Sequence, residues 1–547
     1  MSDEQKYSLL DTAFAEFLTQ RTSFNKSQKA LFNSVIAELS YQQSQGHSCI
    51  HINQAEQALI QSSTLASDPC VSPLVLEKNR LYLQRYWFYE NRLAQQIKAF
   101  LQVKHAVNDV NPLLNRYFIE LIDEIDWQRQ AAKKAITHAF NIIAGGPGTG
   151  KTTTVVKILA LLQEIAIKDE NPLHIALAAP TGKAATRLQE SIGQSKYKLD
   201  CLDIIKAAIP EEVVTIHRLL GASQFSPYFT YNKKNPLAFD IIVVDEASMI
   251  DLALMVELIQ VIPPHAQIIM LGDHFQLPAV EPGQVFAECV ERFERCTYSH
   301  DLARRLAVLS GFDAVKLRKE SQLTVEDAAT QEDTEVEFHP LCQLRKTYRF
   351  SGDLKTAAEQ IKLGKSHLFK KQFAVQAMQE PEQAVRWHAL NDENTRLSLV
   401  SGYREYFECI QSKASLPTLD IITKAFDRFQ LLCSTHEGPL GVVQMNELIE
   451  RQFVYQHELQ SRYGSGFYHG KAILVTRNHP HLGVFNGDVG FVIASTKKTN
   501  SWNIHFPLQN QTALIVAPGR LREWQPAYAM TVHKSQGSEY QHVGIVL

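Results

Sequence analysis

The stretch "FNIIAGGPGTGKTTTVVKILALL", residues 140–162, decides the fold class of this chain. It begins with an apolar run typical of a buried strand, passes through a glycine-rich turn and continues with the apolar spacing of a helix. The turn fits the pattern G-x-x-x-x-G-K-[ST], in which glycines let backbone N–H groups face a phosphate at the start of the next helix. The sequence therefore predicts a strand, a phosphate-binding loop and a helix.

This loop supplies the first candidate nucleotide-binding residues. We expect the Lys151 ammonium to neutralise phosphate oxygens and the Thr152 hydroxyl to bind Mg²⁺. A glycine turn with a purely structural role is the alternative, and the strand and helix patterns on either side of the loop disfavour it. The other candidates in the loop are Gly145, Gly146, Pro147, Gly148, Thr149, Gly150 and Thr153.

Three more apolar runs follow, "HIALAAP" at 174–180, "FDIIVVDE" at 239–246 and "QIIMLGD" at 267–273. Nearly continuous apolar strands separated by helical patterns predict a buried parallel sheet, and hence an α/β fold. The second run delivers Asp245 and Glu246 to the end of a strand. We expect Asp245 to hold Mg²⁺ and Glu246 to orient and activate the attacking water, which predicts hydrolysis of a nucleoside triphosphate. Two solvated carboxylates at a strand end are the alternative.

Side chains outside the loop complete the predicted nucleotide site. Gln128, in "IDWQRQAA", can pair its amide with the edge of an adenine. Gln276, in "GDHFQLP", is placed to sense the γ-phosphate. In "RKTYRF", Tyr348 is a candidate for stacking and Arg349 for binding phosphate.

Pattern changes along the chain predict its domains. Residues 1–115 read as a helical domain, 116–345 as a first α/β domain with a small insertion at about 190–235, and 346–547 as a second. Short strands with Asn-Gly and Gly-Asp turns predict a small β-barrel inserted at about 437–520. The net charge of −3 gives no basic footprint for the whole protein, but it leaves room for a locally basic groove. The absence of an apolar run of about 18 residues and the scattered cysteines favour a cytoplasmic protein without a membrane segment.

Several strings, taken in order, resemble the motifs of superfamily 1 helicases. They are "TGKAA" (181–185), "TIHRLLG" (215–221), "VVDEASMID" (243–251), "GDHFQLP" (272–278), "LLCSTHEGPLGVVQMNE" (431–447), "RNHPHLGVFNGDVG" (477–490) and "AMTVHKSQGSE" (529–539). Together they resemble the RecD family, the alpha subunits of exodeoxyribonuclease V. The resemblance covers most of the chain and is strongest from about 120 to 547.

This resemblance implies two RecA-like domains, an SH3-like barrel in the second and a partner-binding helical N-terminal domain. It also implies an ATP-dependent, 5′-to-3′ helicase on single-stranded DNA, which joins RecB-like and RecC-like subunits in repairing double-strand breaks and has no nuclease site of its own. The ATP-site residues it implies are Gln128, Lys151, Thr152, Asp245, Glu246, Gln276, Tyr348 and Arg349. Gly537 and Glu539 lie where the second domain closes on nucleotide. The implied DNA-binding residues are Thr181, Gly182, Lys183, Thr215, His217, Thr531, His533 and Lys534.

Some alternatives stay open at this point. A nucleoside triphosphatase that ignores DNA would not explain the late motifs. A catalytically impaired structural subunit is the other alternative, because the chain stops at Leu547 before the arginine-bearing last motif of such helicases. The sequence therefore predicts a chain that is incomplete at its C-terminus. His217 is either a DNA contact or a buried histidine, and His479 and His481 lie in a loop that departs from the family and lacks the ligands of a metal site.

Overall fold

The structure is a computed structural model in which the chain forms two compact units, residues 1–351 and 352–547. It describes residues 6–105, 111–118, 125–223, 225–294, 296–298, 303–304, 306, 315, 335–336, 339–348, 352–374, 384–388, 397, 399–411, 417–455, 466–494, 502–507 and 513–547.

A parallel sheet forms the centre of the first unit. Its order is β11-β4-β8-β7-β5-β6, and every neighbouring pair is parallel. The strands are β4 (Phe140–Gly145), β5 (Ile175–Ala179), β6 (Val214–Thr215), β7 (Ile241–Val244), β8 (Gln267–Gly272) and β11 (Leu341–Leu344). The α/β fold with a buried parallel sheet is therefore confirmed, and the apolar runs quoted above form its central strands.

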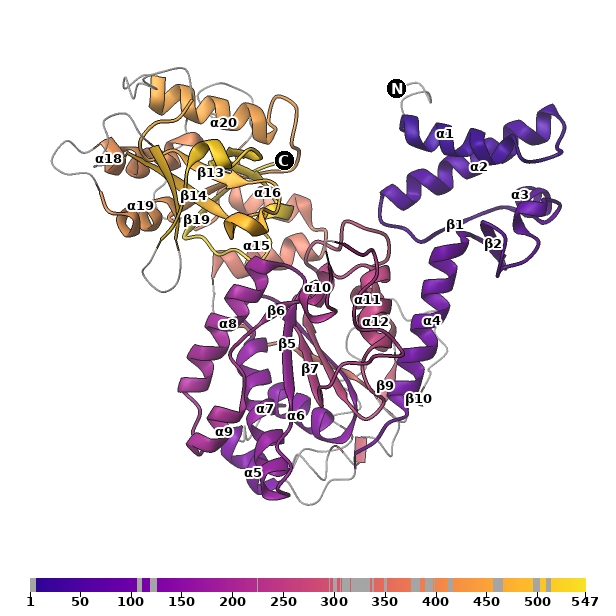
Figure 1. Ribbon diagram of the computed structural model, residues 1–547, viewed down its shortest axis with the longest axis horizontal. Helices are drawn as coiled ribbons and strands as arrows, with labels where there is room; N and C mark the ends of the chain where they lie inside the picture. Colours follow the sequence, from indigo (N-terminus) through magenta and orange to yellow (C-terminus); the bar gives the residue numbers. More distant parts are fainter. Residues whose placement is uncertain are drawn as a thin grey trace. The chain divides into compact units, whose positions relative to one another are not determined.

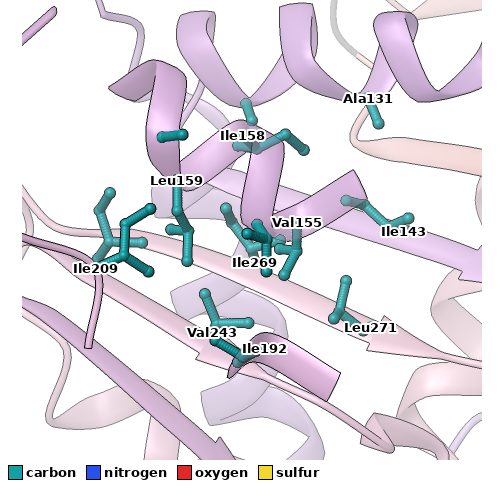
Figure 2. Close-up of a cluster of buried hydrophobic side chains, with 14 of the residues drawn as sticks. Ala131, Ile143, Val155, Ile158, Leu159, Ile192, Ile209, Val243, Ile269 and Leu271 are labelled. Atoms are coloured by element: carbon teal, nitrogen blue, oxygen red, sulfur yellow. The ribbon is translucent and has the colours of Figure 1, made fainter. Parts of the chain in front are cut away.

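Helices cover both faces of this sheet, and its central strands β4 and β7 are buried along their whole length (Figure 1). On one face lie α6 (Trp127–Thr137), α7 (Lys151–Lys168) and α8 (Gly182–Tyr197), and on the other α4 (Gln84–Leu101), α11 (Leu252–Gln260) and α12 (Val285–Glu294). Alternate residues of a strand serve opposite faces, so Ile143 packs against the first layer and Ile142 against the second. Figure 2 shows the first layer, with Val155, Ile158 and Leu159 of α7 near the strand residues Ile143, Val243, Ile269 and Leu271.

Shorter elements complete the first unit. Within the predicted insertion at 190–235, β6 lengthens the parallel sheet, so this part of the chain belongs to the domain itself. The remaining elements are α5 (Asn111–Tyr117), α9 (Asp203–Ala208), α10 (Ile216–Leu219) and the parallel pair β9 (Thr297–Tyr298) and β10 (Glu335–Val336).

The N-terminal segment is helical, as predicted, and it also contains a small antiparallel sheet. Helices α1 (Leu9–Thr19), α2 (Lys26–Ser44) and α3 (Gln54–Gln61) each begin at a capping box, and they share a core with the sheet. The sheet order is β1-β3-β2, with β1 at Cys49–His51, β2 at Leu74–Glu77 and β3 at Arg80–Leu83. These strands are too short for alternation to distinguish them from loops. Helix α4, which falls inside the predicted N-terminal domain, packs on the large parallel sheet instead.

The second unit contains a parallel sheet of order β18-β12-β19. Its strands are β12 (Phe429–Cys433), β18 (Ala529–Thr531) and β19 (His542–Val546). The core around it is rich in aromatic rings, among them Tyr403, Tyr406, Phe426 and Tyr528. The helices are α15 (Asp353–Lys362), α16 (Ser366–Phe373), α18 (Arg404–Gln411), α19 (Leu419–Phe426) and α20 (Val442–Glu450).

An antiparallel sheet of order β16-β15-β14-β13-β17 occupies the place of the predicted barrel. Its strands are β13 (Ala472–Val475), β14 (Val489–Ala494), β15 (Trp502–Phe506), β16 (Leu514–Val516) and β17 (Trp524–Pro526). Among the described residues β16 and β17 do not pair, so the sheet is open there. The inserted sheet starts later than predicted, because α20 lies inside 437–520 and buries Val442, Met445 and Ile449 in the core of the parallel sheet. None of the helices that the structure describes is long and apolar enough to cross a membrane.

Candidate functional site

The carboxyl ends of the parallel strands bring most of the predicted nucleotide-site residues of the first unit to one edge. The phosphate-binding loop follows β4, Asp273 follows β8, Asp245 follows β7 and Thr181 follows β5 closely. In parallel sheets this edge is where ligands bind. Arg349 lies outside the described residues.

The phosphate-binding loop is held by its own hydrogen bonds. Gly148 and Gly150 have φ of 74° and 83°, which a residue with a Cβ rarely adopts. The Thr149 hydroxyl donates to the Gly146 carbonyl at 2.8 Å. Lys151 Nζ donates to the carbonyls of Gly145 at 2.7 Å and Gly146 at 3.3 Å. The ammonium is therefore folded over the loop, at the position from which it can meet phosphate oxygens.

Gln128 lies against the same loop. The Asp126 side chain caps α6 by accepting from the backbone N–H groups of Gln128 at 2.9 Å and Arg129 at 3.1 Å. This cap directs the first turn of α6 toward the loop, where Gln128 Nε2 donates to the Thr149 carbonyl at 3.5 Å. The predicted adenine-reading amide is thus placed beside the glycines that face phosphate.

Tyr348 also lies at the loop, within the first unit. Its backbone N–H donates to the Gly148 carbonyl at 2.8 Å, and the Thr347 hydroxyl donates to the Pro147 carbonyl at 3.4 Å. The prediction that residues from 346 onward belong to the second domain does not hold for Tyr348. The reason is long-range pairing, since β11 lies parallel to β4 and the residues that follow it run beside the loop that follows β4. The Tyr348 ring is 65% exposed and available for stacking.

Asp245 and Glu246 form a partly buried acidic pair, and the Glu246 backbone is strained. Burial raises the pKa of the Asp245 carboxyl, although the Glu246 N–H donates to Asp245 Oδ1 at 2.9 Å and the charge of Lys151 opposes the rise. Burial also raises the pKa of Glu246 to about 7, and the Asp245 charge adds to the effect. Glu246 has a φ of 51°, one of three non-glycine residues in the described chain with positive φ. Strain of this kind concentrates at functional sites.

Two residues that were not among the predicted site residues act on this pair. The Asp273 charge raises the pKa of Glu246 and the Arg187 charge lowers it. Asp273 is buried, accepts from the Phe275 N–H at 3.1 Å through Oδ1, and accepts from the Gln276 N–H at 3.1 Å through its carbonyl. The position of Asp273 directly after a buried strand could have identified it as a site residue from the sequence. No sequence signal pointed to Arg187, because it lies in the second turn of α8.

Three predicted DNA-binding threonines share one geometry. Each ends or closely follows a parallel strand, and each hydroxyl accepts from the backbone of the helical turn that comes next. The distances are 3.2 Å for Thr181 and Ala184 N, 3.3 Å for Thr215 and Arg218 N, and 3.4 Å for Thr531 and Lys534 N. Thr531 is in the second unit. A helical turn begins at each of these caps, and the start of a helix suits a nucleic-acid phosphate.

The other DNA-site candidates are accessible. His217 is exposed, with its ring centroid 6.0 Å from that of Phe229, so the alternative of a buried histidine is wrong. Gly182 and His533 are exposed and Lys183 is partly exposed. Burial lowers the pKa of Lys534. Gly537 forms a turn with φ of 69°, and Glu539 is exposed two residues later.

The loop with His479 and His481 has a structural explanation. His479 Nε2 lies 3.1 Å from Glu523 Oε2, and Arg477 Nη1 lies 3.8 Å from the other oxygen of the same carboxylate. The two basic side chains thus share one acid on the neighbouring segment. No group of three or more His, Cys, Asp or Glu side chains in the described residues could hold a metal ion.

Comparisons with known proteins show which family the chain belongs to. A model of the RecBCD enzyme subunit RecD N-terminal domain matches residues 4–70, and a model of an AAA domain matches residues 128–282. The RecBCD enzyme subunit RecD of Haemophilus influenzae is 32% identical over 521 residues, which cover 90% of this chain and 76% of that protein. The chain belongs to the RecD family.

Other RecD relatives fit this assignment. The Mycobacterium tuberculosis RecD subunit is 32% identical over 493 residues, which cover 90% of this chain and 75% of that protein. The ATP-dependent RecD2 DNA helicase of Deinococcus radiodurans is 32% identical over 210 residues, 38% of this chain and 25% of that protein. The resemblance seen in the motifs is therefore confirmed. This RecD chain is an ATP-hydrolysing DNA helicase.

Proposed function

We propose that this RecD chain couples ATP hydrolysis in its first unit to 5′-to-3′ movement along single-stranded DNA. The observation that carries the proposal is the shared strand edge. The phosphate-binding loop, the acidic pair Asp245 and Glu246, and the capped turns at Thr181 and Thr215 all follow parallel strands of one sheet. A change at the nucleotide can therefore reach strand-binding turns through short, rigid connections.

In the proposed hydrolysis, Lys151 neutralises the β- and γ-phosphate oxygens and Gln276 contacts the γ-phosphate. Glu246, with a pKa near 7, orients the attacking water and accepts its proton. Gln128 reads the adenine edge, and Tyr348 stacks on the base. Arg349 supplies a further positive charge to the phosphates, and Gly537 and Glu539 link DNA binding in the second unit to the nucleotide.

The residues present fit a magnesium ion. The pKa of the Asp245 carboxyl is raised by burial, so its negative charge is only partly compensated within the chain, and Thr152 is the partly buried second residue of α7. Mg²⁺ is commonly held by one or two such groups together with substrate phosphates and waters. Thr152 and Asp245 would hold the ion, which when bound neutralises charge on the transferred phosphate. Within this chain the Glu246 N–H and the Lys151 charge favour the ionised form of Asp245 and oppose the effect of burial.

The DNA contacts proposed here are mainly to phosphates. The turns at Thr181–Lys183, Thr215–His217 and Thr531–Lys534 present backbone N–H groups and basic side chains, and neither feature reads base sequence. Movement without sequence preference follows from such contacts.

The relatives are named as subunits of a RecBCD enzyme. We infer that this chain likewise assembles with RecB-like and RecC-like subunits in the cytoplasm, and that it processes duplex ends in recombinational repair. The match to the RecD N-terminal domain at residues 4–70 supports the N-terminal segment as the surface that binds a partner. Co-purification of the chain with the two subunits, lost when residues 1–70 are deleted, is the expected result.

The decisive experiment measures ATP hydrolysis by the full chain with and without oligothymidylate, beside Lys151→Gln. Strong stimulation by the oligonucleotide, absent in the variant, is expected. Hydrolysis that ignores the oligonucleotide would favour a DNA-independent nucleoside triphosphatase, and tight nucleotide binding without hydrolysis would favour a catalytically impaired subunit. Unwinding of partial duplexes with a 5′ tail, but not of those with a 3′ tail, tests the polarity.

A further inference from the structure

Two site-bearing loops of the first unit meet at one crowded point. Gly283 follows Gln276 in the loop between β8 and α12, and its φ is 100°. A Cβ on Gly283 would lie 2.4 Å from the Leu252 Cβ, and the Leu252 N–H donates to the Pro282 carbonyl at 3.2 Å. Leu252 is the first residue of α11, which follows the strained Glu246 and a short helical turn. The loop after β7 and the loop after β8 are therefore fixed to each other at Leu252–Gly283.

The N-terminal segment is bonded to this junction. Gly46, in the turn between α2 and β1, has a φ of 91°, and its carbonyl accepts from the Gly283 N–H at 3.0 Å. Two residues after Gly46, the Ser48 hydroxyl donates to Glu90 on α4, which ties the same turn to that helix. The N–H of Gly283 is thus satisfied by a residue of the N-terminal segment.

Helix α4 makes a second attachment to α11. The Arg92 guanidinium donates to the side-chain carbonyl of Gln260, the last residue of α11, and Gln260 in turn donates to Glu257. Apolar residues of α4, including Leu93, pack in the same core as Leu252. Helix α4 is thus bonded to the last residue of α11, and the N-terminal segment is bonded to Gly283, next to Pro282, whose carbonyl accepts from the first residue of α11.

The charges at this interface also reach α12. Burial raises the pKa of Glu288, in the first turn of α12. Glu90 on α4 and Glu291 on α12 add to the rise, while Arg80 of β3 opposes it. The beginning of α12, two residues after Gly283, is therefore influenced by charges from the N-terminal sheet, from α4 and from α12 itself.

We propose that Gly46 and Arg92 are positioning residues for ATP hydrolysis, through which the N-terminal segment sets the placement of Glu246 and Gln276. The inference rests on the proposed roles of those two residues in hydrolysis. Reacting groups tolerate very little displacement, because an error of about 1 Å can lower a rate about 100-fold. Since the phosphate-binding loop makes none of the junction contacts described above, the N-terminal segment sets the rate of hydrolysis and leaves nucleotide affinity unchanged.

The test uses Gly46→Ala, Arg92→Ala and the double variant Gly46→Val/Arg92→Ala in the full chain. A Cβ at Gly46 meets no atom within 4 Å, so the substitution strains only the turn. Gly364→Ala is the matched control, because Gly364 has a φ of 65° with similarly open space and lies in the second unit. The measurements are kcat for DNA-stimulated ATP hydrolysis, the Kd of a fluorescent ADP, hydrogen exchange at the Gly283 N–H, and thermal unfolding.

We expect kcat to fall about threefold to tenfold in each single variant and further in the double variant. The ADP Kd should stay within about twofold of the parent. Exchange at Gly283 should become faster in the Gly46 variants, and Gly364→Ala should match the parent. If the double variant folds and keeps the parental kcat, the proposal is wrong. If the double variant does not fold, the proposal is wrong when Gly46→Ala shows faster exchange at the Gly283 N–H but keeps the parental kcat. A parent without ATPase activity contradicts the proposed function instead, so the two failures are distinguishable.

Discussion

The amide nitrogen of Gln128 lies 2.9 Å from the point where a Cβ would stand on Gly150. The same nitrogen approaches the Thr149 carbonyl at 3.5 Å. The candidate adenine-reading residue and the last glycine of the phosphate-binding loop are therefore in contact. A residue with a Cβ is disfavoured at position 150 both by the φ of 83° and by the Gln128 side chain.

This contact predicts a sharp effect of Gly150→Ala. The new methyl group must displace Gln128 and accept an unfavourable backbone conformation, at a cost of about 1–2 kcal/mol for the backbone alone. We expect a lower Tm and a Kd for ATP weakened by about tenfold or more, measured by calorimetry. Gly193→Ala is the control, since Gly193 lies within α8 with open space around it, and there the same substitution should be neutral or stabilising. Equal effects of the two variants would contradict this explanation.

Lys151→Gln removes the charge that folds over the loop at the Gly145 carbonyl. We expect ATP hydrolysis to fall by about a thousandfold or more, because the Lys151 charge is proposed to stabilise the phosphate oxygens directly in the transition state. Circular dichroism and binding to the partner subunits should not change. Lys168→Gln, at the opposite end of α7, is the matched control and should hydrolyse ATP like the parent. Activity of Lys151→Gln at the parental rate would show that the site has been placed wrongly.

The raised pKa of Glu246 predicts a pH dependence of hydrolysis. The ionised form accepts the proton, so kcat should rise as the pH increases through about 7. The acidic limb should be lost, together with nearly all activity, in Glu246→Gln. A pH profile of kcat at saturating ATP measures this dependence. A kcat that stays constant between about pH 6 and 8 would exclude Glu246 as the general base.

The same pKa predicts an effect on stability with a definite sign. The folded-state pKa is raised above the unfolded value, so the stability contributed by the protonated carboxyl is complete below about pH 4.5 and is lost as the pH rises through about 7. Above pH 7 the buried charge destabilises the fold. We therefore expect Glu246→Gln to be more stable than the parent by about 2 kcal/mol at pH 8 and equal to it near pH 4. Urea unfolding without nucleotide or Mg²⁺ measures the difference.

Tyr348 should affect ATP binding more than turnover. Its backbone is bonded to Gly148 and its ring is exposed, so Tyr348→Ala removes a stacking surface and leaves the loop in place. We expect KM for ATP to rise about threefold to tenfold with a smaller change in kcat, as for the loss of a binding contact. Tyr197→Ala, which removes a still more exposed ring at the end of α8, should leave both constants unchanged. A fall in kcat alone would argue against stacking.

Two substitutions of Thr181 test whether its hydroxyl, which caps α8, is needed for DNA binding. Thr181→Val keeps the shape but removes the hydroxyl that accepts from Ala184 N, whereas Thr181→Ser keeps the hydroxyl. Loss of such a cap costs about 1 kcal/mol. We expect the valine variant to need more oligothymidylate for half-maximal stimulation of ATP hydrolysis, and the serine variant to resemble the parent. Identical behaviour of the two would indicate that the hydroxyl has no part in DNA binding.

The local features of this protein follow from the sequence by itself. Continuous apolar runs predicted strands β4, β5, β7 and β8, and the glycines of the loop predicted the backbone of 145–150, because both depend on neighbouring residues. Order along the chain was likewise enough to place Lys151, Asp245 and Glu246 at one sheet edge, since parallel strands end on the same side.

Tertiary structure alone decided which distant segments meet. The pairing of β11 with β4 brings Tyr348 to Gly148, the packing of α6 places Gln128 over Gly150, and the turn at Gly46 holds Gly283. Short strands such as β1 and β6 depend on the same kind of contact, because three or fewer residues carry no readable alternation. These arrangements depend on long-range strand pairing and side-chain packing. The free energy of both comes from residues far apart in the sequence, so no local sequence pattern predicts them.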